Sequence, residues 1–142
     1  MPANTKKTKN IALSYARMWP RELFDIVDEG KLAVKVCEDL QKPGVYVLYR
    51  EEQPYYIGKA SVSLFRRLHA HANQTTDRYF NLWNYFSAFV VDKKHIDEVE
   101  GILIASMPTA NSAAPKIDII PIPPSLSRIL RKTRQGRYGR QK

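Results

Sequence analysis

The sequence predicts an α+β fold in which helices pack on a small antiparallel sheet. Two segments of strand length, VYVLYR and YYIGKA, are separated by a short polar turn, and this pattern is typical of a β-hairpin. Two later segments carry apolar residues at the spacing of a helix face. The expected order is therefore β-β-α-β-α, which indicates a small α+β sandwich.

The N-terminal part, residues 1–42, is expected to form an arm and a helical extension. A short helix is expected over residues 11–19. Pro20 stands where a second helix begins and Gly30 where it ends, with an apolar stripe between them. Residues 31–42 alternate in part like a strand, but the spacing of their apolar residues also suits a helix, and we favour the helix.

Residues 43–112 are expected to form the compact core. The hairpin follows a break at Pro43-Gly44, and Ser61 and Ser63 after it are N-cap residues for a helix. The elements expected after the hairpin are a helix over about 64–74, a strand over 84–92 and a helix over 94–107.

The last part, residues 113–142, is expected to form a Pro-rich segment and a basic tail with a short helix near 125–134. It carries eight basic and one acidic side chain, whereas residues 43–112 carry seven of each, and the whole chain has a formal net charge of +9. A neutral core with a basic end indicates that a polyanion, most simply nucleic acid, is held partly by the tail. A solubilising tail is the alternative.

Several classes of protein do not fit the composition. No apolar run approaches the roughly 20 residues that a membrane span needs, and no signal peptide is recognisable. Cys37 is the single cysteine, so a disulfide framework and a cysteine zinc site are excluded. A reducing, cytoplasmic setting is therefore expected, without a membrane partner.

Five side chains stand out as a candidate catalytic set: Tyr46, Tyr56, Arg67, His71 and Glu100. Hairpin pairing can place the two tyrosines side by side. Arg67 and His71 are four residues apart, so they share one helix face. Glu100 follows a core position of the last helix of the core and so borders the buried stripe. Each residue alone also has an ordinary structural interpretation, as a core tyrosine or a solvated charge.

Together these residue types suit hydrolysis of a phosphodiester bond. A carboxylate can hold Mg²⁺ and leave room for water and a phosphate oxygen. An arginine offers a rigid fork of donors for the charge that builds on phosphorus. A tyrosine or histidine near the metal can relay a proton from the attacking water. Gly58 would let the backbone approach a ligand closely.

The order of these residues resembles the GIY-YIG nuclease family. Gly44-Val45-Tyr46 is followed after nine residues by Tyr56-Ile57-Gly58, which is similar to the defining motif of the family. The further matches are Lys59-Ala60, Leu64-x-x-Arg67-Leu68, His71, Glu100 followed by Leu103-Ile104, and Pro108-x-x-Asn111. The resemblance covers residues 43–112. The family arginine commonly lies where Arg66 stands here, so the choice between Arg66 and Arg67 stays open.

The resemblance implies a divalent-metal-dependent DNA endonuclease in which water attacks the phosphodiester directly. It assigns Mg²⁺ or Mn²⁺ to Glu100, the scissile phosphate to Arg67, and water activation to Tyr46 or Tyr56. The other side chains expected to support the relay, to hold the site together (Asn111) or to bind nucleic acid are His71, Lys59, Gly58, Arg66, Asn111, Arg128, Arg131, Lys132, Arg134 and Arg137. A catalytically inactive nucleic-acid-binding module is the alternative, and a homodimer is expected if cleavage is sequence-specific.

Overall fold

The computed structural model describes residues 10–115 and 117–138, so the arm expected before residue 10 lies outside the described part. Four strands form one antiparallel sheet, which runs in the order β1, β6, β4, β5. Their bounds are Ala12–Pro20 for β1, Tyr85–Val91 for β6, Gly44–Arg50 for β4 and Gln53–Ala60 for β5. The α+β class is confirmed, and so are the hairpin and the third predicted strand.

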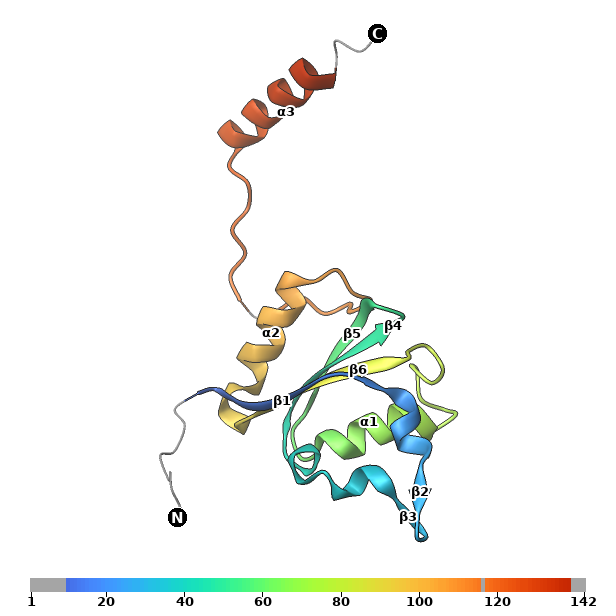
Figure 1. The fold of residues 1–142 in the computed structure, drawn as a ribbon. Coiled ribbons are helices and arrows are strands. Elements are labelled where there is room, and N and C mark those ends of the chain that lie inside the picture. Colours follow the sequence, from blue (N-terminus) through green and yellow to red (C-terminus); the bar gives the residue numbers. More distant parts are fainter. Residues whose placement is uncertain (1–9, 116, 139–142) are drawn as a thin grey trace, which may run out of the picture.

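The sheet has an apolar core on each face. Tyr46 and Leu48 of β4 point to the face that helix α1 covers, whereas Val45 and Val47 point to the face that helix α2 covers. Figure 1 shows the two helices on opposite sides of the sheet. A strand that is buried on both faces reads as a continuous apolar run, which explains the sequence VYVLY.

The two core helices lie close to where the sequence places them. Helix α1 spans Leu64–Asn73, and Ser63 caps it by accepting a 3.3 Å hydrogen bond from the Arg66 backbone. Helix α2 spans Ile96–Ser106 and follows a 3-10 turn. Both predicted helices are therefore confirmed, with α2 shorter at each end.

The predicted N-terminal helices are wrong. Residues expected as a helix over 11–19 form the edge strand β1, and the segment from Pro20 to Gly30 holds a 3-10 helix and the start of a small hairpin. The remaining short elements are β2 (Val27–Asp28), β3 (Lys31–Leu32) and two 3-10 helices at Ala33–Val36 and Glu38–Gln41. Gly30 has a φ of +78° and forms the hairpin turn rather than a helix end.

The pairing of β1 with β6 explains the wrong helix prediction. The register shifts between Ala16 and Trp19, and Met18 at this bulge has a φ of 52°. Its backbone N–H donates to the Ser87 side chain at 3.1 Å instead of a strand partner. Because of the bulge, apolar and polar residues do not alternate regularly along this edge strand. Its sequence therefore matches neither the alternation of a strand nor the spacing of a helix face.

The tail forms a longer helix than the sequence predicts. Helix α3 spans Pro124–Tyr138, follows an extended segment from Ile117, and projects away from the sheet (Figure 1). Apolar side chains in the segment are exposed, with Ile119 at 86% and Ile120 at 91%. Among the described residues, no helix combines the length and the apolar character needed to cross a bilayer.

Candidate functional site

The predicted catalytic residues gather around β5, which is one edge of the sheet. Helix α1 brings Arg67 and His71 to this edge from one face. Helix α2 brings Glu100 from the opposite face, beside Lys59 of β5. Tyr56 adjoins both groups, because it packs against the core that α1 covers and also lines a pocket with Glu100.

A buried row of polar side chains runs beneath Arg67. The Tyr46 hydroxyl lies 2.7 Å from His71 Nε2, and His71 Nδ1 lies 2.9 Å and 3.0 Å from the two carboxylate oxygens of Asp77. The charge of the Arg67 guanidinium acts on the Tyr46 hydroxyl and opposes the rise of its pKa. The four groups therefore form one connected network from α1 to the loop that follows it.

Burial dominates the protonation of this network. Tyr46 has no exposed surface, and burial raises the pKa of its hydroxyl far above the usual 10.0 despite the opposing charge of Arg67. Burial also lowers the pKa of His71 below 6.5, although its bond to Asp77 acts in the opposite direction. Near neutral pH, Tyr46 is a neutral hydroxyl and His71 is a neutral imidazole.

The expected role of Gly58 needs correction. Gly58 is paired with Tyr46 across the hairpin, and a Cβ at this position would overlap the ring and hydroxyl of Tyr46. The space that glycine leaves is therefore filled by Tyr46, not kept open for a ligand. A side chain at this position would displace the ring that holds His71.

Tyr56 is placed differently from Tyr46. Its ring stacks on Tyr79 with 4.2 Å between centroids, and the two motif tyrosines are 6.4 Å apart by the same measure. Burial raises the pKa of Tyr56, with a contribution from Tyr79, while Arg67 lowers it. Tyr56 also lines a pocket of about 270 Å³, so its side chain reaches a space that can hold water and a substrate.

Both arginines of the α1 motif face one open pocket of about 370 Å³, which Ser61, Ser63 and Gln74 also line. Arg66 and Arg67 are exposed, which suits contact with an anion from solvent. Only Arg67 interacts with Tyr46 beneath the pocket. Both candidate phosphate ligands therefore line one pocket. Arg67 differs from Arg66 because it also interacts with the buried Tyr46.

The pocket beside Tyr56 holds the carboxylates. Glu100 and Asp97 lie one turn apart on α2, and both line this pocket with Lys59. The Lys59 ammonium lies 2.7 Å from Asp97 Oδ1 and 4.0 Å from Glu100 Oε1, and the bond to Asp97 raises the pKa of Lys59. A cation thus already sits beside both carboxylates.

These carboxylates fit a hard divalent ion. Within the described residues, no three histidine, cysteine or acidic side chains converge on one point. Mg²⁺ commonly uses one or two protein carboxylates and fills the rest of its octahedron with water and substrate oxygens. Glu100, whose side chain is 20% exposed, and Asp97 provide that number of ligands.

Asn111 links the loop after α2 to strand β5, which carries part of the site. Its amide nitrogen donates to the Ile57 carbonyl at 2.8 Å, and its amide oxygen accepts from the Ile57 N–H at 2.9 Å. The neighbouring Ala110 N–H donates to Tyr55 at 2.7 Å. The loop after α2 is therefore tied to β5 at the YIG motif, which is a different arrangement from a direct nucleic-acid contact.

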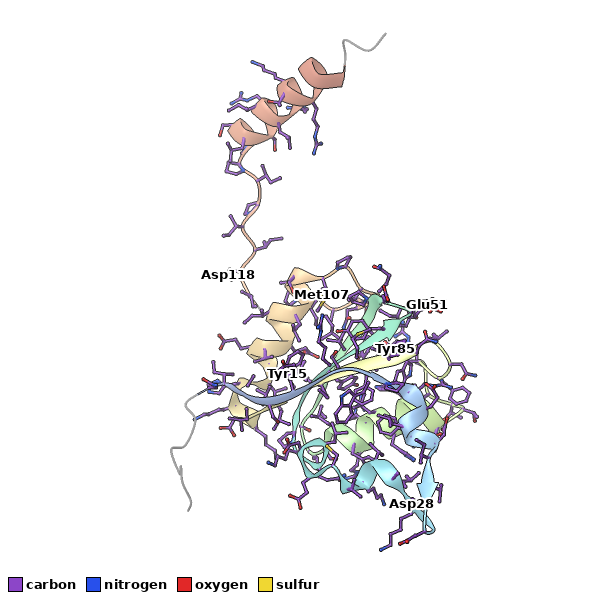
Figure 2. The ribbon with its side chains drawn as sticks, viewed as in Figure 1. Tyr15, Asp28, Glu51, Tyr85, Met107 and Asp118 are labelled. Atoms are coloured by element: carbon purple, nitrogen blue, oxygen red, sulfur yellow. The ribbon has the colours of Figure 1, made fainter. Side chains whose placement is uncertain are left out.

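The basic residues of the tail are not brought to these pockets. Arg128, Arg131, Lys132 and Arg134 are exposed on α3, which stands apart from the sheet, and Figure 2 shows its side chains projecting outward. Arg137 lies on the same helix, but its side chain is outside the described part.

Three residues of the site were not identified from the sequence. Asp97 could have been found, because it precedes Glu100 by three positions on one helix face. Asp77 and Tyr79 lie in the irregular segment between α1 and β6, where no periodicity relates them to a catalytic group. Their contacts with His71 and Tyr56 appear only in the folded chain.

No protein-family model and no curated protein sequence matches this chain. Among solved structures, it is similar to the GIY-YIG N-terminal endonuclease domain of UvrC from Thermotoga maritima bound to its catalytic divalent cation, magnesium. That match has 28% identity and a TM-score of 0.41, and it covers 50% of this chain and 83% of that chain. A point mutant of the same domain matches with 27% identity over 50% and 82%, also at a TM-score of 0.41.

Proposed function

We propose that this chain is a divalent-metal-dependent endonuclease that hydrolyses phosphodiester bonds in DNA. The observation that carries the proposal is the placement of opposite charges around Tyr56. Arg67 is on α1 and Glu100 on α2, which cover opposite faces of the sheet, and the charges of both side chains act on Tyr56. One side suits a metal ion and the other suits a phosphate, as phosphodiester hydrolysis requires.

Glu100 would hold Mg²⁺ or Mn²⁺, with Asp97 beside it on the same helix face. A divalent ion bound there supplies positive charge that polarises a phosphate oxygen and lowers the pKa of a bound water. Lys59, which lies near both carboxylates, offsets part of their negative charge and can turn toward a phosphate oxygen.

Arg67 binds the scissile phosphate from the pocket on α1, and Arg66 beside it binds a neighbouring part of the backbone. The guanidinium donors stabilise the negative charge that develops on the nonbridging oxygens. Asn111 keeps β5 in place relative to α2, so the two charged sides remain at a fixed separation.

Tyr56, rather than Tyr46, is the tyrosine that meets the attacking water. Tyr56 lines the pocket that Glu100 lines, whereas Tyr46 has no exposed surface. Burial raises the pKa of Tyr56, and the charge of Arg67 opposes this rise, so Arg67 favours the deprotonated form that can accept a proton from the water. The water oxygen bonds to phosphorus, the bond to the 3′ oxygen breaks, and that oxygen takes up a proton.

The test is incubation of the full chain with supercoiled plasmid DNA in Mg²⁺, with a parallel reaction in EDTA. We expect nicked and linear products only with the metal, and ends that carry a 5′-phosphate and a 3′-hydroxyl. A protein that binds the plasmid but leaves it intact in both Mg²⁺ and Mn²⁺ is instead an inactive nucleic-acid-binding module. Matched RNA in the same assay determines whether DNA is the preferred substrate.

A further inference from the structure

We propose that Asp77 is a positioning residue that acts through His71 and Tyr46 to hold the Arg67 guanidinium at the phosphate pocket. The inference rests on the proposed function where it concerns catalysis. Its structural part, the proton arrangement of the network, concerns the protein alone. Asp77 belongs to no motif identified in the sequence, and its place is set by the loop between α1 and β6.

The two ends of the network allow only one arrangement of protons. A carboxylate accepts hydrogen bonds and a guanidinium only donates them. His71 must therefore carry its proton on Nδ1, which faces both oxygens of Asp77. Its Nε2 then has a free lone pair for the Tyr46 hydroxyl, 2.7 Å away. Because the Tyr46 hydroxyl donates its proton to His71 Nε2, the lone pairs of its oxygen are left to face Arg67.

The opposite tautomer of His71 conflicts with both neighbours. A proton on Nε2 would point at Tyr46, and the bare Nδ1 would face the carboxylate of Asp77. The Tyr46 hydroxyl would then need another acceptor for its own proton, although its surroundings are fully buried. An unsatisfied buried donor costs about 1–3 kcal/mol. The carboxylate of Asp77 thus selects the tautomer that orients Tyr46 toward Arg67.

Asp77 also anchors the loop in which it lies. Its Oδ1 accepts the Tyr79 N–H at 2.8 Å, and the Tyr79 ring stacks on Tyr56. A purely structural role would therefore consist of this loop contact. The two roles are separable, because an asparagine at position 77 keeps an oxygen for Tyr79 while its NH₂ group faces His71.

Asp77→Asn is therefore the informative variant. With its oxygen on Tyr79, its NH₂ group takes the place of the second carboxylate oxygen, so His71 Nδ1 loses the negative charge and one of its two acceptors, and the preference for the Nδ1–H tautomer weakens. Asp77→Ala removes the loop anchor as well and shows the effect of losing both contacts. Asp28→Asn is the matched control, because it removes the same charge from the β2–β3 hairpin, away from the site (Figure 2).

The first measurement uses the ¹⁵N-labelled full chain without substrate. The chain holds three histidines, so the His71 ring signals are assigned by comparison with His71→Gln. We expect the two-bond ¹H–¹⁵N pattern of an Nδ1–H imidazole in the parent protein and in Asp28→Asn. Asp77→Asn should show a larger share of the Nε2–H form than the parent, and the guanidinium protons of Arg67 should exchange with water faster.

The second measurement is cleavage. Asp77→Asn should lower kcat by about 10- to 100-fold, the size typical of losing a side chain that orients a functional group through other residues. The dissociation constant for DNA, measured in Ca²⁺, should change less than twofold. In an Arg67→Ala background, Asp77→Asn should have almost no further effect, because residues that act through one group are not additive.

The possible results separate the inference from the proposed function. A tautomer ratio in Asp77→Asn that is unchanged from the parent, or Arg67 protons that exchange at an unchanged rate, overturns the inference whether or not the protein cleaves DNA. Full additivity with Arg67→Ala overturns the positioning role. If the parent protein does not cleave, the proposed function fails, and the altered tautomer with faster Arg67 exchange still supports the network.

Discussion

Arg66 and Arg67 are adjacent on α1 and face the same pocket, but only Arg67 interacts with the buried Tyr46. A donor that is fixed in place before the reaction stabilises developing charge better than a mobile one. Arg67→Ala should therefore slow cleavage by about 10²- to 10³-fold. Arg66→Ala, the matched control, should be milder. Single-turnover rates check this, and the reverse order would assign the scissile phosphate to Arg66.

The two motif tyrosines should respond differently to loss of the hydroxyl. Tyr56→Phe keeps the ring that stacks on Tyr79, so we expect little change in the free energy of unfolding. Its cleavage rate should fall by about 10²- to 10⁴-fold, as for a lost acid–base group. Tyr46→Phe leaves His71 Nε2 without a partner and should destabilise the fold by about 1–3 kcal/mol.

Urea unfolding and single-turnover cleavage, measured on both phenylalanine variants, test this difference. A stable Tyr46→Phe protein with the larger loss of rate would make Tyr46 the group that meets the water.

Motif spacing could predict that the tyrosines, the Arg66–Arg67 pair and His71 lie near one another, because neighbours on one helix face or one hairpin are set by local geometry. The function of Gly58 could not be predicted, because it depends on the Tyr46 ring that crosses from the paired strand. Asp77 could not be predicted either, because an irregular loop brings it to His71.

At the scale of elements, the β4–β5 hairpin should be sensitive to small additions at its centre. Gly58→Ala places a methyl group against Tyr46, which is fully buried and cannot move aside. Overpacking of this kind costs about 1–3 kcal/mol. We expect that loss in urea unfolding, together with slower cleavage. Gly136→Ala on α3 is the control, because nothing lies within 4 Å of the added carbon, and an equal loss there would contradict this account.

The elements that the sequence predicts well are those whose pattern follows from local burial. Strand β4 is buried on both faces, and α1 has a regular apolar stripe with a serine cap. Strand β1 was missed because its identity depends on β6, which lies far along the chain, and because the bulge at Met18 interrupts its alternation. Distant pairing of this kind leaves little local signal.

At the scale of the whole molecule, the charge on α3 suits binding rather than chemistry. Arg128, Arg131, Lys132 and Arg134 are exposed on a helix that projects from the sheet (Figure 2). Each phosphate contact contributes about 0.9 to the slope of log K against log salt. Replacing these four residues with glutamine should weaken DNA binding and reduce that slope by up to about four times this amount, while cleavage at low salt persists.

Binding isotherms over a range of salt concentrations measure the slope. Lys31→Gln is the control, since Lys31 lies in the β2–β3 hairpin, which Figure 1 shows away from α3. An unchanged slope in the α3 variant would make the tail a solubilising segment. Lost cleavage with intact folding and binding would place part of the active site on α3. Deleting residues 125–142 should reproduce the effect and include the tail positions outside the described part.

The central claim is that the carboxylate of Glu100 recruits the metal ion for hydrolysis. Glu100→Gln keeps the shape of the side chain but removes its charge, so the proposed metal ligand is lost. The glutamine still occupies the same place in the lining of the pocket, beside Tyr56 and Lys59. The most direct measurement is the rate of plasmid nicking in Mg²⁺ by the parent and variant proteins at saturating concentration. We predict that the variant does not nick the plasmid but binds DNA in EDTA as the parent does. Equal nicking by the two proteins would contradict the claim and remove Glu100 from the mechanism.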